Sequence, residues 1–276
     1  MRKAAVLGSP IGHSLSPVLH RAAYAALGLT GWTYQAIECD EPRLPGLLAG
    51  CGPDWAGLSL TMPLKRAVLD LLDEAEPLVA EVGAANTVTF EGGARRGHNT
   101  DVPGMITALA ELGLPAAAGP PSVLILGAGA TACSALAAVR ALGVTEVTVA
   151  ARDPRRAGDL LAAAARLGVT VRVSAFSDPG VPAPGLLVST APAGAADSCA
   201  ERISRGDHIP GCVLDVVYHP WPTPLAVAAA QAGIPVAGGF SLLLHQAARQ
   251  VELMTGRAAP VGAMRAAGLD ALAMRV

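Results

Sequence analysis

The segment from Ser122 to Arg156 constrains the fold more than any other part of the sequence. A short apolar run at its start predicts a buried parallel strand. The strand ends in a turn of small residues, Gly127-Ala128-Gly129-Ala130-Thr131-Ala132. An alanine-rich helix is predicted from Cys133 to Leu142, and a second strand from Glu146 to Ala151. A strand, turn, helix and strand in this order are the setting in which G-x-G-x-x-(G/A) indicates a dinucleotide-binding domain.

Each small residue of the turn has a physical reason. Gly127 permits the tight turn, Gly129 lets the backbone approach a pyrophosphate, and Ala132 allows the helix to pack closely on the sheet. The helix N-terminus adds free N–H groups and the positive end of its dipole. A glycine-rich turn that binds nothing is the alternative, and the flanking strands make it less favoured.

The end of the second strand bears on which nucleotide would bind. Arg152, Arg155 and Arg156 follow that strand, and guanidinium groups match the 2′-phosphate of NADP bidentately. Asp153 lies among them. It would suit the ribose hydroxyl of NAD, or it caps the helix that begins at Pro154.

Length and composition limit the function classes. A chain of 276 residues with 52% apolar residues can form two domains or a single α/β barrel. A net charge of −2 with 15% charged residues argues against a nucleic acid or an anionic membrane as partner. Five cysteines without C-x-x-C pairs predict neither a disulfide framework nor a metal site. No apolar stretch suits a membrane span or a signal peptide, so we expect a soluble cytoplasmic protein.

The N-terminal part reads as an α/β domain. Strands are predicted over residues 3–7, 33–39 and 56–60, with a short helix near residues 43–48. A Pro/Gly-rich loop leads to a helix that ends near Leu27. Ser16 before Pro17 is a predicted N-cap of this helix, and Ser14 and Ser16 together would equally suit a carboxylate ligand.

Lys65 is one of only two lysines in the chain and stands in the first turn of a helix predicted from Pro63 to Leu72. Helix N-termini disfavour cations, so an acid or a substrate would have to compensate Lys65, unless the side chain is simply exposed. Asn86 and Thr87 could form the turn before a strand over residues 88–90. Asp101 could cap a helix over residues 103–112, which a linker over residues 116–121 follows.

After Arg156 the alternation of strands and helices continues. A helix to Leu167 is predicted first, followed by strands over residues 170–173, 185–189 and 212–216. A short helix over residues 226–232 and a strand over residues 235–237 follow. Ligands of open parallel sheets bind beyond the carboxyl ends of strands, so the loops after residues 189 and 216 should face the cofactor. Helices are predicted from Ser241 to Met254, with Gln246 in the second turn, and over residues 261–274.

Several segments in order resemble the shikimate dehydrogenase family, the NADP-dependent reductases of the aromatic amino acid pathway. They span nearly the whole chain and are Gly8-Ser9-Pro10-Ile11 with His13-Ser14-Leu15-Ser16-Pro17, Leu60-Thr61-Met62-Pro63-Leu64-Lys65, Gly83-Ala84-Ala85-Asn86-Thr87, Asn99-Thr100-Asp101, Gly127-Ala128-Gly129-Ala130, and Tyr218-His219-Pro220 with Thr223-Pro224-Leu225.

The resemblance implies an α/β fold of two domains. Residues 1–101 plus 239–276 would form an N-terminal α/β substrate domain, and residues 102–238 a Rossmann-like doubly wound domain that binds NADP. The implied activity is the interconversion of 3-dehydroshikimate and shikimate. The implied partner is a small-molecule substrate, with no nucleic acid and no membrane, and the chain would be a monomer or a homodimer.

The resemblance also assigns roles to residues. Lys65 and Asp101 would be the catalytic acid/base pair. Substrate would be bound by Ser14, Ser16, Thr61, Asn86, Tyr218 and Gln246. NADP would be bound by Gly127, Ala128, Gly129, Ala130, Thr131, Ala132, Arg152, Arg156, Thr190, Val216, Gly239 and Leu242, with no metal.

The sequence departs from the family pattern at a few positions, and these leave alternatives open. Ser59 stands where the family usually has Asn, and Asp153 could relax the coenzyme preference toward NAD. Ala151, Ser189, Thr190 and Ser241 also differ. Quinate or an amino analogue of shikimate would suit the same scaffold. A non-catalytic NADP-binding regulatory protein is less favoured, because a sensor has no need of the Lys65/Asp101 pair.

Overall fold

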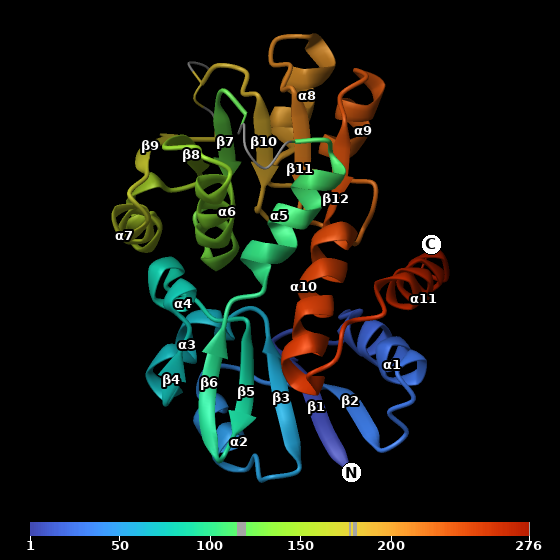
Figure 1. Cartoon of the computed structure of the whole chain (residues 1–276). Coiled ribbons are helices and arrows are strands. Elements are labelled where there is room, and N and C mark those ends of the chain that lie inside the picture. The colour runs from blue at the N-terminus through green and yellow to red at the C-terminus, as the bar shows by residue number, and fades with distance from the viewer. Residues whose placement is uncertain (115–119, 177, 179–180, 276) are drawn as a thin grey trace. The chain divides into compact units, whose positions relative to one another are not determined.

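The computed structural model describes residues 1–114, 120–176, 178 and 181–275 (Figure 1). The chain forms two compact units, Met1–Gly104 with Leu243–Val276, and Met105–Leu242. It passes from the first unit to the second within α5 (Asp101–Glu111) and returns within α10 (Gly239–Thr255). The predicted division lay a few residues earlier in each helix. The roles predicted for the two domains stay predictions.

The first unit is built on a mixed six-stranded sheet in the order β2-β1-β3-β5-β6-β4. The strands β2, β1 and β3 run parallel to one another, and β5 is antiparallel to both of its neighbours, β3 and β6. The edge strand β4 pairs with β6 in parallel. The strands are β1 (Arg2–Gly8), β2 (Trp32–Glu38), β3 (Trp55–Leu60), β4 (Glu74–Ala75), β5 (Thr87–Glu91) and β6 (Ala94–His98).

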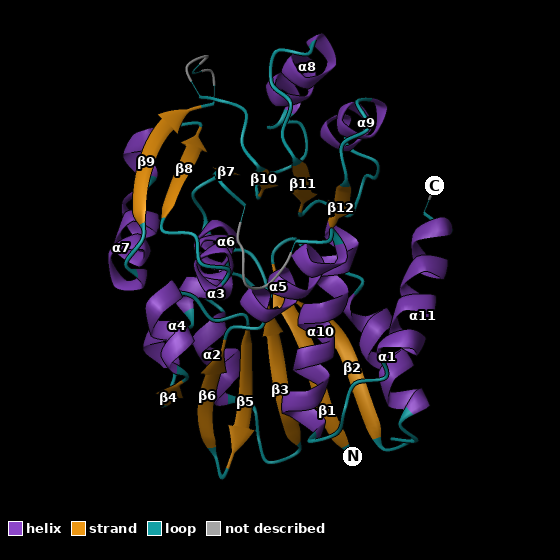
Figure 2. Cartoon of the chain, turned by 45° about the horizontal axis from the view of Figure 1, so that its top comes forward, coloured by secondary structure: helices purple, strands orange, loops and turns teal. Residues whose placement is uncertain are grey.

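Alternating side chains of β1 divide the core of this unit into two layers. Leu7 packs in one cluster with Leu44 and Leu64, whereas Val6 packs in another with Tyr24 and Met254. Both views place α10 in front of β1 and β3 (Figure 1, Figure 2). The other helices are α1 (Ser16–Ala26), α2 (Leu44–Ala49), α3 (Leu64–Ala67), the 3₁₀ helix η1 (Leu69–Leu71), α4 (Pro77–Val82) and α11 (Val261–Ala273).

The second unit has an all-parallel six-stranded sheet in the order β12-β11-β10-β7-β8-β9. This is the strand order of a doubly wound dinucleotide-binding domain, with its switch point between β7 and β10, and it confirms the predicted fold class. The strands are β7 (Val123–Leu126), β8 (Glu146–Ala151), β9 (Thr170–Ala175), β10 (Leu186–Ser189), β11 (Cys212–Asp215) and β12 (Val236–Gly238).

Helices pack on this sheet through small and apolar residues. Leu124 and Leu126 of β7 lie in one cluster with Ile203 and Ala228. Residues 132–139 of α6 are all buried, which explains the alanine-rich composition of that helix. The helices are α6 (Ala130–Ala141), the 3₁₀ helix η2 (Pro154–Arg156), α7 (Gly158–Leu167), α8 (Asp197–Arg205) and α9 (Pro224–Gln231).

The structure corrects several predicted elements. The helix α6 begins at Ala130, three residues before the predicted start, because Gly129 takes the N-cap position. The helix predicted from Pro63 to Leu72 is broken into α3 and η1. The elements β4, β6, α4 and α8 were not predicted, and most of the linker predicted over residues 116–121 lies outside the described residues. Among the helices of the described residues, none has the length and apolar character that a membrane span requires.

Candidate functional site

A lysine and a carboxylate form a close, mostly buried pair in the first unit. The Nζ atom of Lys65 lies 2.6 Å from Oδ2 of Asp101, and the two side chains are 16% and 7% exposed. Lys65 stands on the short helix α3 that follows β3, and Asp101 is the first residue of α5. The alternative of a simply exposed lysine is therefore wrong, and Asp101 is the acid that pairs with the Lys65 ammonium.

Asp101 does not act as the cap that was an alternative for it. Asn99 takes that part, because its Oδ1 accepts a hydrogen bond from the backbone N–H of Val102 at 3.2 Å. The second carboxylate oxygen of Asp101, Oδ1, accepts from Nδ2 of Asn86 at 2.8 Å. Both oxygens of Asp101 are thus engaged by donors that point at the same site.

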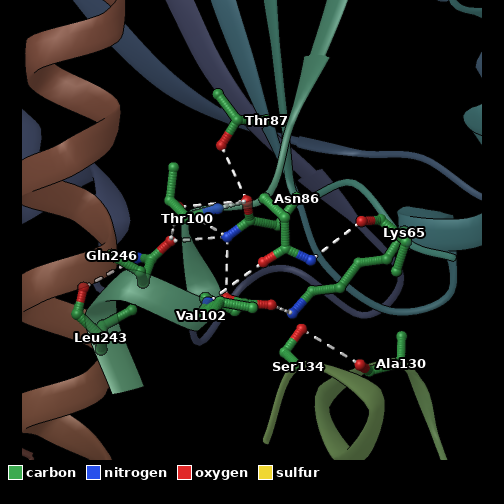
Figure 3. A network of polar contacts seen from close by, with 12 residues as sticks. Lys65, Asn86, Thr87, Thr100, Val102, Ala130, Ser134, Leu243 and Gln246 are labelled. Atoms are coloured by element: carbon green, nitrogen blue, oxygen red, sulfur yellow. Dashed lines mark hydrogen bonds and ion pairs between the residues drawn. The ribbon is translucent and has the colours of Figure 1, made fainter. Parts of the chain in front are cut away.

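Asn86 lies at the centre of a polar network with Thr87, Thr100 and Gln246 (Figure 3). Its Oδ1 accepts from the backbone N–H of Thr100 at 2.8 Å and from the hydroxyl of Thr87 at 3.1 Å. Its Nδ2 lies 3.3 Å from Oε1 of Gln246. These contacts fix which end of the Asn86 amide faces Asp101. The result is a preorganised group of one ammonium, one carboxylate and two amides.

The loop that carries the two predicted carboxylate-binding serines is held by Glu38. This side chain accepts from the hydroxyl of Ser9 at 2.6 Å and from the backbone N–H of Ile11 at 3.0 Å. Ser16 is not an N-cap, since Leu15 holds that position, and the hydroxyl of Ser14 instead accepts from the Ser16 N–H at 3.2 Å. The prediction that Ser16 caps the helix was therefore wrong, and the hydroxyl that accepts a backbone hydrogen bond here belongs to Ser14.

Thr61 follows β3 at the same sheet edge as the serine loop, which follows the neighbouring parallel strand β1. A Cβ added to Gly8 would lie 2.4 Å from Cγ2 of Thr61, so the glycine at this strand end allows the two loops to meet. The structure thus brings Thr61 beside the loop that leads to Ser14 and Ser16.

The two glycines of the turn after β7 have different surroundings. Gly127 has φ +106°, and a Cβ there would lie 2.6 Å from Oγ1 of Thr190. A Cβ on Gly129 would meet nothing within 4 Å, so this side of the turn is open. Behind the turn Ala132 is fully buried against the sheet. The turn is therefore tight at Gly127, open at Gly129 and packed at Ala132, and the binding of a pyrophosphate there stays a prediction.

The arginine-rich segment after β8 gives Asp153 a structural role. Asp153 Oδ1 accepts from the backbone N–H of Arg155 at 3.1 Å, which confirms it as the N-cap of η2. The guanidinium of Arg155 also bonds to this carboxylate, and these bonds lower the pKa of Asp153. Arg152 and Arg156 are exposed on either side. Asp153 is therefore already paired with Arg155.

The remaining predicted cofactor residues lie at the carboxyl edge of the second sheet. Thr190 follows β10, Val216 follows β11 and Gly239 follows β12. A Cβ on Gly239 would lie 2.0 Å from the carbonyl oxygen of Val216, so only glycine fits this position. Leu242 is buried in α10. Tyr218 lies in this second unit, and its part in binding substrate stays a prediction.

Three residues of the polar network were not assigned from the sequence. Thr100 and Thr87 bond directly to Asn86, and Gln250 bonds to Thr87 and to the carbonyl of Asn86. Gln250 carries a signal in the sequence, because it lies four residues after Gln246 on an otherwise apolar helix face. No group of three or more His, Cys, Asp or Glu side chains suited to a metal occurs among the described residues.

A doubly wound sheet with an open phosphate turn, joined to an α/β unit that holds a buried ammonium–carboxylate pair, defines a dinucleotide-binding protein of the oxidoreductase class. The model of the shikimate dehydrogenase substrate binding domain matches residues 6–88, and that of the shikimate 5′-dehydrogenase C-terminal domain matches residues 239–267. The chain belongs to the shikimate dehydrogenase family.

Individual relatives cover almost the whole chain. A shikimate dehydrogenase (NADP⁺) of Citrifermentans bemidjiense is 39% identical over 274 residues, which are 96% of this chain and 93% of the relative. The crystal structure of Mycobacterium tuberculosis shikimate dehydrogenase is 44% identical with a TM-score of 0.86, covering 98% of this chain and 100% of the other. The Thermus thermophilus enzyme in complex with NADP(H) and shikimate is 34% identical with a TM-score of 0.85, covering 99% and 100%.

Proposed function

We propose that this protein is an NADP-dependent oxidoreductase that interconverts 3-dehydroshikimate and shikimate in aromatic amino acid biosynthesis. The observation that carries the proposal is the 2.6 Å contact between Lys65 and Asp101, supported by relatives named for this reaction. A ketone reduction needs one hydride and one proton, and this pair is suited to supply the proton.

The residues of the first unit would bind and orient the substrate. The hydroxyls of Ser14 and Ser16 would take the carboxylate, and Thr61 would take one ring hydroxyl. Asn86 and Gln246 would bind further hydroxyls, since the Asn86 amide contacts Asp101 and the Gln246 amide contacts Asn86. Tyr218 completes the proposed set. Several convergent polar groups would hold the reacting carbon in one orientation.

Lys65 would give a proton to the carbonyl oxygen during reduction and take it back during oxidation. Asp101 keeps the ammonium in place through Oδ2, and Asn86 keeps Asp101 in place through Oδ1. The positive charge of Lys65 also stabilises the negative charge that develops on the oxygen as the hydride arrives. One residue thus serves both as proton donor and as electrostatic stabiliser.

NADPH, when bound, supplies the hydride. The backbone N–H groups at the start of α6 would donate hydrogen bonds to the pyrophosphate, which could approach the open side of Gly129. Arg152 and Arg156 would bind the 2′-phosphate. Asp153 is already engaged by Arg155, so it would oppose a nearby 2′-phosphate less than an unpaired carboxylate would. Thr190, Val216, Gly239 and Leu242 complete the proposed set. We further propose a cytoplasmic location, in keeping with five free thiols, and a monomer or homodimer.

The test is the initial rate of nicotinamide absorbance with purified protein, shikimate and NADP, with parallel assays that use NAD or quinate. We expect fast turnover with shikimate and NADP and at most slow turnover in the other assays. Faster turnover of quinate, or faster turnover with NAD, would indicate a quinate dehydrogenase or an NAD-dependent enzyme of the same scaffold. Binding of shikimate and NADP without turnover would refute the proposed activity and favour a non-catalytic regulatory protein.

A further inference from the structure

The helix α10 carries two glutamines, Gln246 and Gln250, that face the same way because they are four residues apart. Gln246 belongs to the proposed substrate site. Gln250 has no role in that site and is only 1% exposed. A glutamine buried to this degree has to satisfy its amide within the protein.

The amide of Gln250 is satisfied by three contacts from two strands. Its Oε1 accepts from the hydroxyl of Ser59 in β3 at 2.8 Å. Its Nε2 donates to the hydroxyl of Thr87 at 2.9 Å and to the carbonyl oxygen of Asn86 at 3.3 Å. The helix is thereby tied to β3 and to the start of β5, which Asn86 directly precedes.

The hydrogen bonds through Gln250 all run in one direction. Tyr34 donates to Ser59 at 2.6 Å, Ser59 donates to Gln250, and Gln250 donates to Thr87. The single hydroxyl proton of Thr87 is then directed to Oδ1 of Asn86. Burial raises the pKa of Tyr34, so this first donor keeps its proton.

We propose that Gln250 is a positioning residue for the Lys65–Asp101 pair. Gln250 acts through Asn86, whose Nδ2 donates to Asp101. It also acts through Gln246, because Gln250 anchors α10 and so holds Gln246 beside Asn86. This role rests on the proposed function, because it concerns the same reaction. An apolar side chain at position 250 would leave the buried hydroxyl of Ser59 without its acceptor and that of Thr87 without its donor, and the network would rearrange to satisfy them.

Two variants separate positioning from mere packing. Gln250→Met keeps the length of the side chain but removes both bonding functions. Gln250→Glu keeps the shape, and its carboxyl group can donate to Thr87 only while it is protonated. Once ionised it can only accept, so the proton of Thr87 turns away from Asn86. Burial raises the pKa of such a carboxyl group above its ordinary value of about 4.3.

We expect Gln250→Met to lower kcat/KM for shikimate about tenfold at every pH, the effect of one lost buried hydrogen bond. For Gln250→Glu, the ratio of kcat/KM to that of the unmodified enzyme should rise as pH falls through the pKa of the new carboxyl group. Tyr34 and the Lys65–Asp101 pair are the titratable groups at the two ends of the chain of bonds. The Gln250→Glu variant and the unmodified enzyme both contain these groups, so their effect on kcat/KM largely cancels in the ratio of the two enzymes. Gln35→Met, at an exposed position of β2, is the matched control and should change neither quantity.

The second measurement is a crystal structure of unliganded Gln250→Met, which does not depend on turnover. We expect the Asn86–Asp101 contact of 2.8 Å or the Asn86–Gln246 contact of 3.3 Å to be lost. A flat pH ratio for Gln250→Glu, or an unchanged network in the crystal, would overturn the role of Gln250. If the unmodified protein does not turn over shikimate, the proposed function fails, and the crystal structure alone still decides whether Gln250 positions Asn86.

Discussion

Lys65 illustrates how one residue can be locally unfavourable and still be held in place. Its side chain is only 16% exposed, so the charge is largely removed from water. Asp101 compensates this cost, and Asn86 in turn engages Asp101. A surface pair such as Lys3 and Asp54, both more than 40% exposed, has no comparable constraint on its geometry.

Substitution of Lys65 by Ala should lower kcat by about two to four orders of magnitude while changing the affinity for shikimate much less. The reason is that a general acid/base contributes mainly to the transition state. Steady-state kinetics and calorimetric binding of shikimate measure the two quantities. Lys3→Ala removes the only other lysine and should leave kcat unchanged. A Lys65→Ala enzyme with near-normal kcat would refute the assignment.

The arginines after β8 should set coenzyme preference. Arg152→Ala should raise the KM for NADP at least about tenfold and leave the KM for NAD nearly unchanged, because only NADP carries the 2′-phosphate. The measurement is initial rates with each coenzyme at saturating shikimate. Arg172→Ala, which removes an exposed arginine of β9, is the control for lost charge. An equal loss with both coenzymes would argue that Arg152 does not contact the 2′-phosphate.

At the scale of elements, the turn between β7 and α6 combines two glycines with different duties. Gly127 is needed for the fold, since φ is +106° and Thr190 fills the space of a Cβ. Gly129 has φ −83°, which any residue adopts, and its Cβ position is open. The first glycine is explained by the protein itself, whereas the second is explained by a ligand that approaches the backbone.

Replacing each glycine by Ala should separate these duties. Gly127→Ala should lower the free energy of unfolding by about 1–3 kcal/mol, the usual cost of a strained backbone conformation. Gly129→Ala should change it by no more than about 0.5 kcal/mol yet weaken NADP binding about tenfold. Urea unfolding and fluorescence titration with NADPH measure the two effects. Normal NADP affinity in Gly129→Ala would exclude close approach of the pyrophosphate to this residue.

Local patterns determine most elements of this fold. The strand β8 could be predicted to the residue, because an apolar strand between glycine and arginine leaves little choice. The broken helix after Pro63 could not be predicted, because the carbonyl of Lys65 accepts a backbone hydrogen bond from Ala85, which lies in a separate segment of the sequence. The pairing of Asp101 with Lys65 could be predicted only from the family resemblance, because the local sequence equally suited a helix N-cap at Asp101.

The polar network was harder to predict for the same reason. Ser59 was noted only as a departure from the family pattern, yet in the structure it donates to Gln250, which is 191 residues away. Only the sheet and the return of the chain through α10 bring these residues together. Spacing within one helix indicated that Gln246 and Gln250 share a face, but it gave no information on what that face contacts.

At the scale of the whole molecule, buried histidines couple folding to pH. His20 is fully buried, stacks on Tyr34 with ring centroids 3.9 Å apart, and has its pKa lowered from 6.5 to about 4, mainly by desolvation. Burial also lowers the pKa of His208. In the unfolded chain both rings take up a proton near pH 6.5, so acid favours the unfolded state.

The free energy of unfolding should therefore fall as pH decreases from 6.5 to about 4, by about 3 kcal/mol from His20 alone. Urea unfolding across this range measures the slope. His20→Gln keeps a donor for the carbonyl of Ser16 but does not titrate, so it should flatten the slope, whereas the exposed His13→Gln should not. Below this window, exposed carboxylates such as Asp73, whose bonds with Arg95 lower its pKa to about 2, should add a smaller loss. An unchanged slope in His20→Gln would mean that His20 is accessible to protons in the folded protein.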